Sequence, residues 1–346
     1  MLTKLTHIPF VAQALEQAPF SLVDCGAAGG IDPFFDALRD IAGTRRFGFE
    51  PNPEELKRLK NDSQTQYFDC ALSDALGEAT FYASTTLGSL TDRSAKLSGH
   101  SVSPVTVTVE TIDHLVGEAT IQSPAVIKTD VEGHDYSVIR GATECLDDVL
   151  CVKSEIQWQT HSAEGGFAAI HDLLVSKGFL LFSHSSNYSY LGALQGGDVL
   201  YLKSVDAVLE DSRQDDHKRV QLIRLAVLSC AVGYPEYAIV VSGKAASRGL
   251  LSTDEARAIE DLLGGRVYLP EIFPVTGLGQ KLALLAHLVG AVLLGYKHRA
   301  KSTPKSNQLR PFRRLWVSRD VPIPGSRSAE LVARRKAAVG QPIGDA

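Results

Sequence analysis

The sequence predicts a doubly wound α/β domain, a Rossmann-like parallel sheet closed by an antiparallel hairpin, with a mainly helical C-terminal region behind it. Up to residue 205, short apolar or β-branched runs alternate with helical stretches, the pattern of a parallel sheet with crossover helices. The run PAVIKTD, residues 124–130, is apolar almost to its end, as expected of a strand buried on both faces.

The elements follow from periodicity and turn residues. The segment 32–42 is expected to be a helix with Asp32 as N-cap and Pro33 in its first turn. The runs 78–84 and 104–112 alternate with period two and predict an added antiparallel pair. The remaining sheet strands are expected at 21–25, 45–51, 65–72, 124–130 and 149–157, with the hairpin at 179–186 and 197–203, and further helices at 52–62, 134–146 and 166–178.

Three regions are expected along the chain. Residues 1–205 form the sheet domain, 206–300 a helical C-terminal domain, and 301–346 a basic, Pro- and Arg-rich extended tail. The apolar stretch 282–296 falls short of the roughly 20 residues that span a bilayer. It is expected to be a buried core helix, with interfacial membrane attachment as the alternative.

The charge distribution and the cysteine content indicate which binding partners and which cellular compartment to expect for this protein. The net charge is −5, but residues 297–336 carry twelve Lys and Arg against two acids, which leaves −15 on the remainder. The segment 282–336 is therefore a candidate for peripheral contact with an anionic membrane, on its inner face. Few aromatic residues accompany these charges, so no nucleic-acid partner is expected. Five scattered cysteines and no signal-peptide pattern at the start indicate a reducing, cytoplasmic location.

The segment 24–32 reads DCGAAGGID and follows a predicted strand. It lacks the dinucleotide fingerprint of glycines at the first, third and sixth positions. Glycines 26, 29 and 30 permit a tight turn close to a ligand. The carboxylate of Asp24 at its base would oppose a pyrophosphate but favour a cation, so the loop suits S-adenosylmethionine, which carries an ammonium and a sulfonium.

Two further acids end strands of the predicted sheet, where ligands of such sheets bind. Glu50 ends the second strand, where an acid accepts hydrogen bonds from ribose hydroxyls and disfavours a 2′-phosphate. Its alternative role is an exposed cap of the next helix. Asp69 ends the third strand and could reach an adenine amino group, or be a solvated turn residue.

The chain resembles the FkbM family of S-adenosylmethionine-dependent methyltransferases, over about residues 20–185. The resemblance is carried, in the family's order, by LVDCGAAGG, FGFEPNP, CALSD, VTVETIDHL and, above all, IKTDVEGHDYSVIRGA. It implies a class I methyltransferase sheet and O-methylation of a hydroxyl on a sugar, glycoconjugate or secondary metabolite. It further implies that Asp24, Gly26, Ala27 and Gly30 form the cofactor loop, that Glu50 binds the ribose, and that Asp130, Glu132 and Gly133 lie between cofactor and acceptor.

The chain departs from the family pattern at two places. Ala28 stands where the family commonly has Asn, which removes a polar contact from the loop. The family commonly reads Gly-Ala-Glu where this chain reads Gly133-His134-Asp135, which points to a different acceptor side.

Methyl transfer to an aliphatic hydroxyl needs alignment and a base. Asp130 and His134 are the first candidates for this role, since Asp130 ends the fourth strand and a histidine titrates near neutral pH. Glu155, near the end of the fifth strand, and His161 are second candidates. Asp130, Glu132 and Glu155 could instead collect a divalent cation, and a metal stays unassigned.

Two other functions stay open. A catalytically silent cofactor-binding module could act through its C-terminal region in protein or membrane-surface interaction, which the departures at Ala28 and His134 allow. A nucleic-acid methyltransferase would use the basic arm. The sequence identifies neither the acceptor nor the oligomeric state.

Overall fold

The computed structural model describes residues 1–83, 88–90, 103–158, 165–185, 188–190 and 193–264, with three short strands beyond them. The chain divides into two compact units, Met1–Ser252 and Thr253–Ala346. The predicted domain boundaries at residues 205 and 300 stay predictions.

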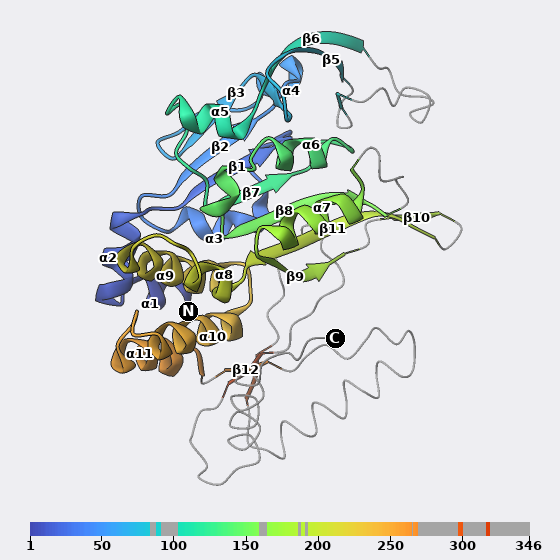
Figure 1. Cartoon of the computed structure of the whole chain (residues 1–346). Coiled ribbons are helices and arrows are strands. Elements are labelled where there is room, and N and C mark those ends of the chain that lie inside the picture. The colour runs from blue at the N-terminus through green and yellow to red at the C-terminus, as the bar shows by residue number, and fades with distance from the viewer. Residues whose placement is uncertain are drawn as a thin grey trace. The chain divides into compact units, whose positions relative to one another are not determined.

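An eight-stranded mixed sheet forms the centre of the first unit (Figure 1). Its strand order is β10-β11-β8-β7-β1-β2-β3, and β9 also pairs with β11. Neighbours from β3 to β8 are parallel, whereas β11 is antiparallel to β8, β9 and β10. The predicted doubly wound sheet with a terminal hairpin is confirmed. The strands are β1 Ser21–Cys25, β2 Arg45–Phe49, β3 Thr65–Phe68, β7 Val126–Thr129, β8 Cys151–Gln157, β9 Phe179–His184, β10 Tyr188–Tyr190 and β11 Ala193–Lys203.

A smaller sheet of order β4-β6-β5 lies beside the first. It contains β4 Cys70–Leu72, β5 Gly77–Ala83 and β6 Ser103–Glu110, and the predicted antiparallel pair is β5 with β6. The prediction of one strand over 65–72 is wrong. The chain leaves the large sheet after β3, and β4 pairs with β6 instead. Asp69, exposed between the two strands, marks the change of partner.

Most crossover helices are shorter than predicted. The segment 32–42 forms the 3₁₀ turn η1 and then the single turn α3; Asp32 caps it, since its Oδ1 accepts a hydrogen bond 2.9 Å long from Phe34 N. The helices of this unit are α1 Leu2–Thr6, α2 Pro9–Gln17, η1 Pro33–Phe35, α3 Asp36–Arg39, α4 Pro53–Leu56, α5 Ile112–Gly117, α6 Asp135–Arg140, η2 Cys145–Asp147, α7 Phe167–Ser176, α8 Val205–Leu209, α9 Asp215–Ala231 and α10 Pro235–Ser247.

Side chains that alternate along the strands place an apolar core on one face of the sheet. Helices α5, α6 and α7 cover this face (Figure 1), and burying it is the main favourable contribution to folding. The opposite face carries charged residues near the strand ends, as described below. The apolar core is built from residues that include Val23, Phe49, Ile127 and Val152 on strands and Ile112, Ile139, Ile170 and Leu174 on helices.

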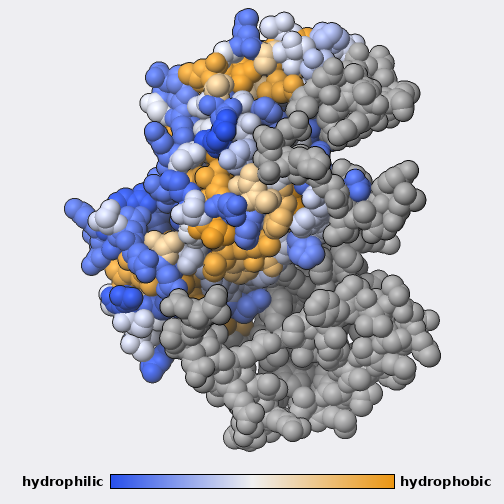
Figure 2. Space-filling model, turned by 45° about the vertical axis from the view of Figure 1, so that its right-hand side comes forward, coloured by the Kyte–Doolittle hydropathy of each residue, from blue (hydrophilic) through white to orange (hydrophobic). Residues whose placement is uncertain are grey.

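Strand β9 leaves part of its apolar surface exposed. Figure 2 shows apolar side chains gathered on this side of the molecule, and Leu180 on β9 and Val175 on α7 are 47% and 48% exposed. Among the described residues β9 pairs only with β11. No helix in the described part of the chain is both long and apolar enough to cross a membrane.

The second unit contains helix α11, Thr253–Gly264, and a small antiparallel sheet of order β12-β14-β13. These strands are Arg266–Tyr268, Trp316–Ser318 and Lys297–Arg299 respectively. The apolar stretch 282–296, most of the basic arm and His161 lie outside the described residues, so the predicted membrane contact through 282–336 stays a prediction.

Candidate functional site

The acids predicted at strand ends follow one edge of the large sheet. Asp24 lies on β1 and Glu155 on β8, while Glu50, Asp69 and Asp130 directly follow β2, β3 and β7. Because the five strands are parallel neighbours in the order β3-β2-β1-β7-β8, their carboxyl ends meet at this edge.

The glycine loop turns sharply at the end of β1. Gly26 and Gly30 have φ values of 77° and 112°, and Gly29 has 79°, all in the range that glycine adopts readily. The N–H groups of Gly26 and Ala27 both donate to the carbonyl of Phe49, at 3.0 Å. The loop is thereby tied to the end of β2, directly before Glu50.

Asp24 and Lys128 form a buried ion pair below this loop. Lys128 Nζ lies 3.0 Å from Asp24 Oδ1 and donates to the carbonyl of Gly26 at 3.1 Å. Asp24 Oδ2 accepts from Asp32 N at 2.7 Å. Burial raises the pKa of Asp24, and Lys128 opposes that rise; although burial also disfavours the charged lysine, Asp24 and Asp130 raise the pKa of Lys128. Asp24 therefore holds the loop at both ends through its two oxygens.

A second buried lysine continues this charged row across the sheet. Lys153 on β8 pairs with Asp32 Oδ2 at 2.8 Å and with Asp198 Oδ1 on β11 at 3.3 Å. Burial opposes the ionised form of Asp32, but the coulombic attraction of Lys153 gives a net lowering of its pKa. Asp32, which caps η1, is thus fixed between the loop and β8.

Glu50 is buried, with only 4% of its surface exposed. Its Oε1 accepts from Asn52 N at 2.7 Å, and burial raises the pKa of Glu50 to about 7. The side chain that caps α4 is that of Asn52, since its Oδ1 accepts from Glu54 N. The geometry therefore disfavours the exposed-cap alternative for Glu50. Asp69, in contrast, is exposed.

Asp130, Glu132 and Glu155 come together at the ends of β7 and β8. One carboxylate oxygen from each lies within 4.8 Å of the others, so the three could hold a cation. Burial, followed by the charges of Asp130 and Glu132, raises the pKa of Glu155 to about 9. A proton on Glu155 therefore relieves the repulsion within this carboxylate cluster at neutral pH.

The loop from Val131 to His134 is held from below by Asp135. The Asp135 carboxylate accepts from the N–H groups of Val131 and Gly133, at 3.4 and 3.2 Å, and burial raises the pKa of Asp135 to about 7. Glu132 has a φ of 57°, a backbone angle that residues other than glycine rarely adopt. Such strain persists where surrounding contacts hold it, frequently at functional sites.

His134 contacts the end of β4. Its Nε2 lies 2.8 Å from Ser73 Oγ, and this hydroxyl also donates to Asp74 Oδ1 at 3.1 Å. Burial lowers the pKa of His134, which keeps the imidazole neutral at neutral pH. Asp74 in turn pairs with Arg140 of α6. The structure thus brings Glu155, rather than His134, into the carboxylate cluster.

Four residues of this edge were not predicted from the sequence: Lys128, Lys153, Asp32 as an ion-pair partner, and Ser73. A signal for the lysines existed, because Lys128 is the one charged residue of the buried strand β7 and Lys153 directly follows an apolar run on β8. Buried charges require partners, and both lysines have acids as neighbours.

The strand order and the polar edge define a Rossmann-like fold of the class I methyltransferase kind. Residues 24–181 match the family model described as the Methyltransferase FkbM domain. This segment of the chain therefore belongs to the FkbM methyltransferase domain family, as its motifs indicated.

A curated relative matches a shorter stretch. The chain is 34% identical over 118 residues to hexuronic acid methyltransferase AglP of Haloferax volcanii, which is 32% of this chain and 46% of the relative. The chain thus spans less than half of the length of that protein.

Solved structures with similar folds have low sequence identity. Methyltransferase FkbM from Methylobacillus flagellatus KT is 14% identical, with a TM-score of 0.33, and the match covers 54% of this chain and 45% of that one. Magnesium protoporphyrin IX methyltransferase from Synechocystis PCC 6803 with bound SAM is 11% identical, with a TM-score of 0.30. That match covers 59% of this chain and 79% of that one. The fold assignment rests on the strand order and on the family match.

Proposed function

We propose that this chain is an S-adenosylmethionine-dependent methyltransferase that acts on a hydroxyl of a sugar or glycoconjugate. The observation that carries the proposal is the burial of the Glu50 carboxylate within an FkbM domain. Glu50 directly follows Phe49, whose backbone carbonyl accepts hydrogen bonds from the glycine loop. When bound, the cofactor supplies an electrophilic methyl group on sulfonium.

The residues of the edge have distinct roles in this proposal. Gly26, Ala27 and Gly30 form the backbone of the cofactor loop, and the Asp24–Lys128 pair holds that loop in place. Glu50 accepts hydrogen bonds from the ribose hydroxyls, which are donors that suit a carboxylate. Asp69 is exposed at the end of β3, from where it can contact the adenine.

The reaction is an in-line displacement in which the acceptor oxygen bonds to the methyl carbon as the carbon–sulfur bond breaks. The leaving group is a neutral thioether, and the hydroxyl proton passes to a base. Asp130 is the preferred base, because its side chain is 42% exposed at this edge whereas Glu155 retains its proton at neutral pH. Neutral His134 is the second candidate, and it would have to release Ser73 Oγ or use its other nitrogen.

The acceptor class is supported by the relative whose name specifies a hexuronic acid. A divalent cation at the carboxylate cluster is an alternative way to offset the charges of Asp130, Glu132 and Glu155. Such a cation would bind hydroxyl oxygens of the acceptor and lower their pKa.

Turnover of cofactor labelled on the methyl group tests the proposal. We expect label to pass to glycans that contain hexuronic acids and not to matched glycans built from neutral hexoses. Transfer to neutral hexoses alone would contradict the acceptor class. Tight cofactor binding without transfer to any extract-derived acceptor would contradict the enzyme and favour the silent binding module.

A further inference from the structure

Helix α9 carries a buried arginine that forms no ion pair with any acid in the described part of the chain. Arg224 is 6% exposed; its Nη1 donates to Gln221 Oε1 at 2.7 Å and its Nη2 to the Pro19 carbonyl at 3.4 Å. Its Nε is buried and has no hydrogen-bond partner among the residues that the structure describes, and a guanidinium has more N–H donors than these two bonds use. Among the described residues, no carboxylate forms an ion pair with Arg224.

A buried cation in this state is costly unless an anion compensates it. The guanidinium lies over an aromatic ring, with 5.5 Å between its central carbon and the Phe20 centroid, which offsets a part of that cost. Burial lowers the pKa of Arg224 to about 10, so the group remains charged at neutral pH.

Arg224 lines an open pocket of about 310 Å³. Pro19, Ser123 and Asp148, which also line it, lie shortly before β1, β7 and β8. The pocket is therefore at the amino edge of the parallel strands, opposite the edge that holds Glu50 and Asp130. The proposed methyl transfer uses none of its residues.

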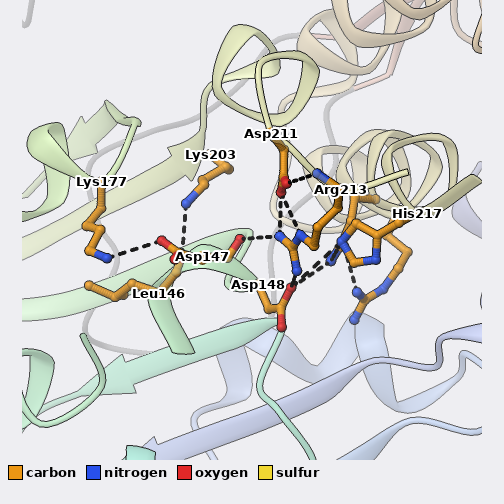
Figure 3. Close-up of polar contacts among 10 residues, drawn as sticks. Leu146, Asp147, Asp148, Lys177, Lys203, Asp211, Arg213 and His217 are labelled. Carbon is orange, nitrogen blue, oxygen red and sulfur yellow. Dashed lines mark hydrogen bonds and ion pairs between the residues drawn. The ribbon is translucent and has the colours of Figure 1, made fainter. Parts of the chain in front are cut away.

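Asp148, the acid that lines the pocket, forms an ion pair with Arg213. Figure 3 shows Arg213 between Asp211 and Asp148; its Nε donates to Asp211 Oδ2 at 2.8 Å, and its Nη1 donates to Asp148 Oδ1. His217 Nε2 lies 3.9 Å from the same Asp148 oxygen. Asp148 is thus held by Arg213 and is not an ion-pair partner of Arg224.

We propose that this pocket is a second ligand site, which binds a small organic carboxylate that also bears a hydroxyl or ammonium group. The planar guanidinium of Arg224 matches a carboxylate, and Val220 and Pro19 offer apolar contacts to a short carbon chain. Asp148 can accept a hydrogen bond from the ligand's donor. The same acid opposes a dianion, so inorganic phosphate is a poorer ligand.

Calorimetry or ligand-observed NMR on the full chain tests this site with L-lactate, propionate and inorganic phosphate. We expect L-lactate to bind at millimolar concentrations, more tightly than propionate, which lacks the donor, and more tightly than phosphate. No binding of L-lactate, or a preference for phosphate, would overturn the proposal.

Two variants and one control locate the ligand. We expect Arg224→Met to weaken L-lactate binding at least about tenfold, since a charge-assisted pair of hydrogen bonds is lost. Arg257→Met removes an exposed arginine of α11 and should leave binding unchanged. Val220→Trp keeps Arg224 and fills the pocket, so it should abolish binding even where Arg224→Met fails to fold. Wild-type affinity in Val220→Trp would place the ligand elsewhere.

Saturation with S-adenosylhomocysteine separates this site from the proposed function. We expect L-lactate binding to persist, because the pocket lies at the opposite edge of the sheet. Competition between the two ligands would assign L-lactate to the cofactor edge and overturn the second site, whereas loss of methyl transfer alone would not affect it.

Discussion

The carbonyl oxygen of Asp130 occupies the space into which a side chain on Gly26 would project. A Cβ at Gly26 would lie 2.0 Å from this oxygen, which no real contact permits. The end of β7 and the glycine loop after β1 are therefore in direct backbone contact. The candidate base and the glycine loop are positioned by one another.

Replacement of Gly26 by alanine should disrupt this contact, and Gly29 provides a matched control. Both glycines have nearly the same φ, 77° and 79°, so alanine at either position brings the same left-handed strain of about 1–2 kcal/mol. A Cβ at Gly29 meets nothing within 4 Å. We expect Gly26→Ala to lose cofactor affinity at least about tenfold, and Gly29→Ala to lose much less. Equal effects by calorimetry would show that the close approach is unimportant.

Removing Lys128 should leave a buried carboxylate without its partner. We expect Lys128→Met to reduce the free energy of unfolding by about 3–5 kcal/mol, measured by urea denaturation. Lys57→Met, which removes an exposed lysine paired with Glu54, should have little effect.

The double variant Asp24→Asn with Lys128→Met tests the pairing itself. The neutral amide at position 24 needs no cation. The double variant should therefore lose less free energy of unfolding than the two single variants lose together. Additive costs would mean that Asp24 and Lys128 stabilise the fold independently.

Cofactor affinity should depend on the protonation of Glu50. The ionised carboxylate accepts hydroxyl hydrogen bonds more strongly, and its pKa is about 7. Affinity should therefore rise with pH between about 6 and 8 and level off above, with a limiting slope of about tenfold per pH unit below the pKa. In Glu50→Gln the affinity should be lower at least about tenfold and nearly independent of pH. Glu54→Gln, an exposed neighbour, is the control; a wild-type slope in Glu50→Gln would assign the dependence to another group.

Asp130→Asn should separate chemistry from binding. We expect turnover to fall by about 10²-fold or more, while S-adenosylhomocysteine affinity and thermal stability change little. Glu78→Gln on β5 removes an exposed carboxylate and should retain full turnover. Full turnover in Asp130→Asn would remove this residue from the mechanism and leave His134 as the base.

Chelation should distinguish a proton from a metal at the carboxylate cluster. Since Glu155 holds a proton at neutral pH, the cluster is already partly neutralised, and we expect EDTA to leave turnover unchanged. A loss of turnover that Mg²⁺ restores would instead assign Asp130, Glu132 and Glu155 to a cation that orients the acceptor.

Local patterns predicted much of this site. The spacing of Asp24 and the glycines, the position of Glu50 and the motif around Asp130 each lie within a short stretch, so the sequence alone placed them at strand ends. The prediction of one strand over 65–72 failed because the strand pattern does not reveal the partner: β3 and β4 continue one another in sequence but pair with β2 and β6.

The sequence by itself determined the fold class, the family and the position of the glycine loop at a strand end, because apolar periodicity, turn residues and motifs act over a few positions; that this loop binds a cofactor stays a prediction. Only the tertiary structure decided that Lys128 neutralises Asp24, that Asp130 and Glu155 share one cluster, and that Arg224 lines a pocket whose acid, Asp148, is paired with Arg213. These relationships join residues from different strands and helices. Their distances follow from strand order and helix packing, which no local stretch of sequence encodes.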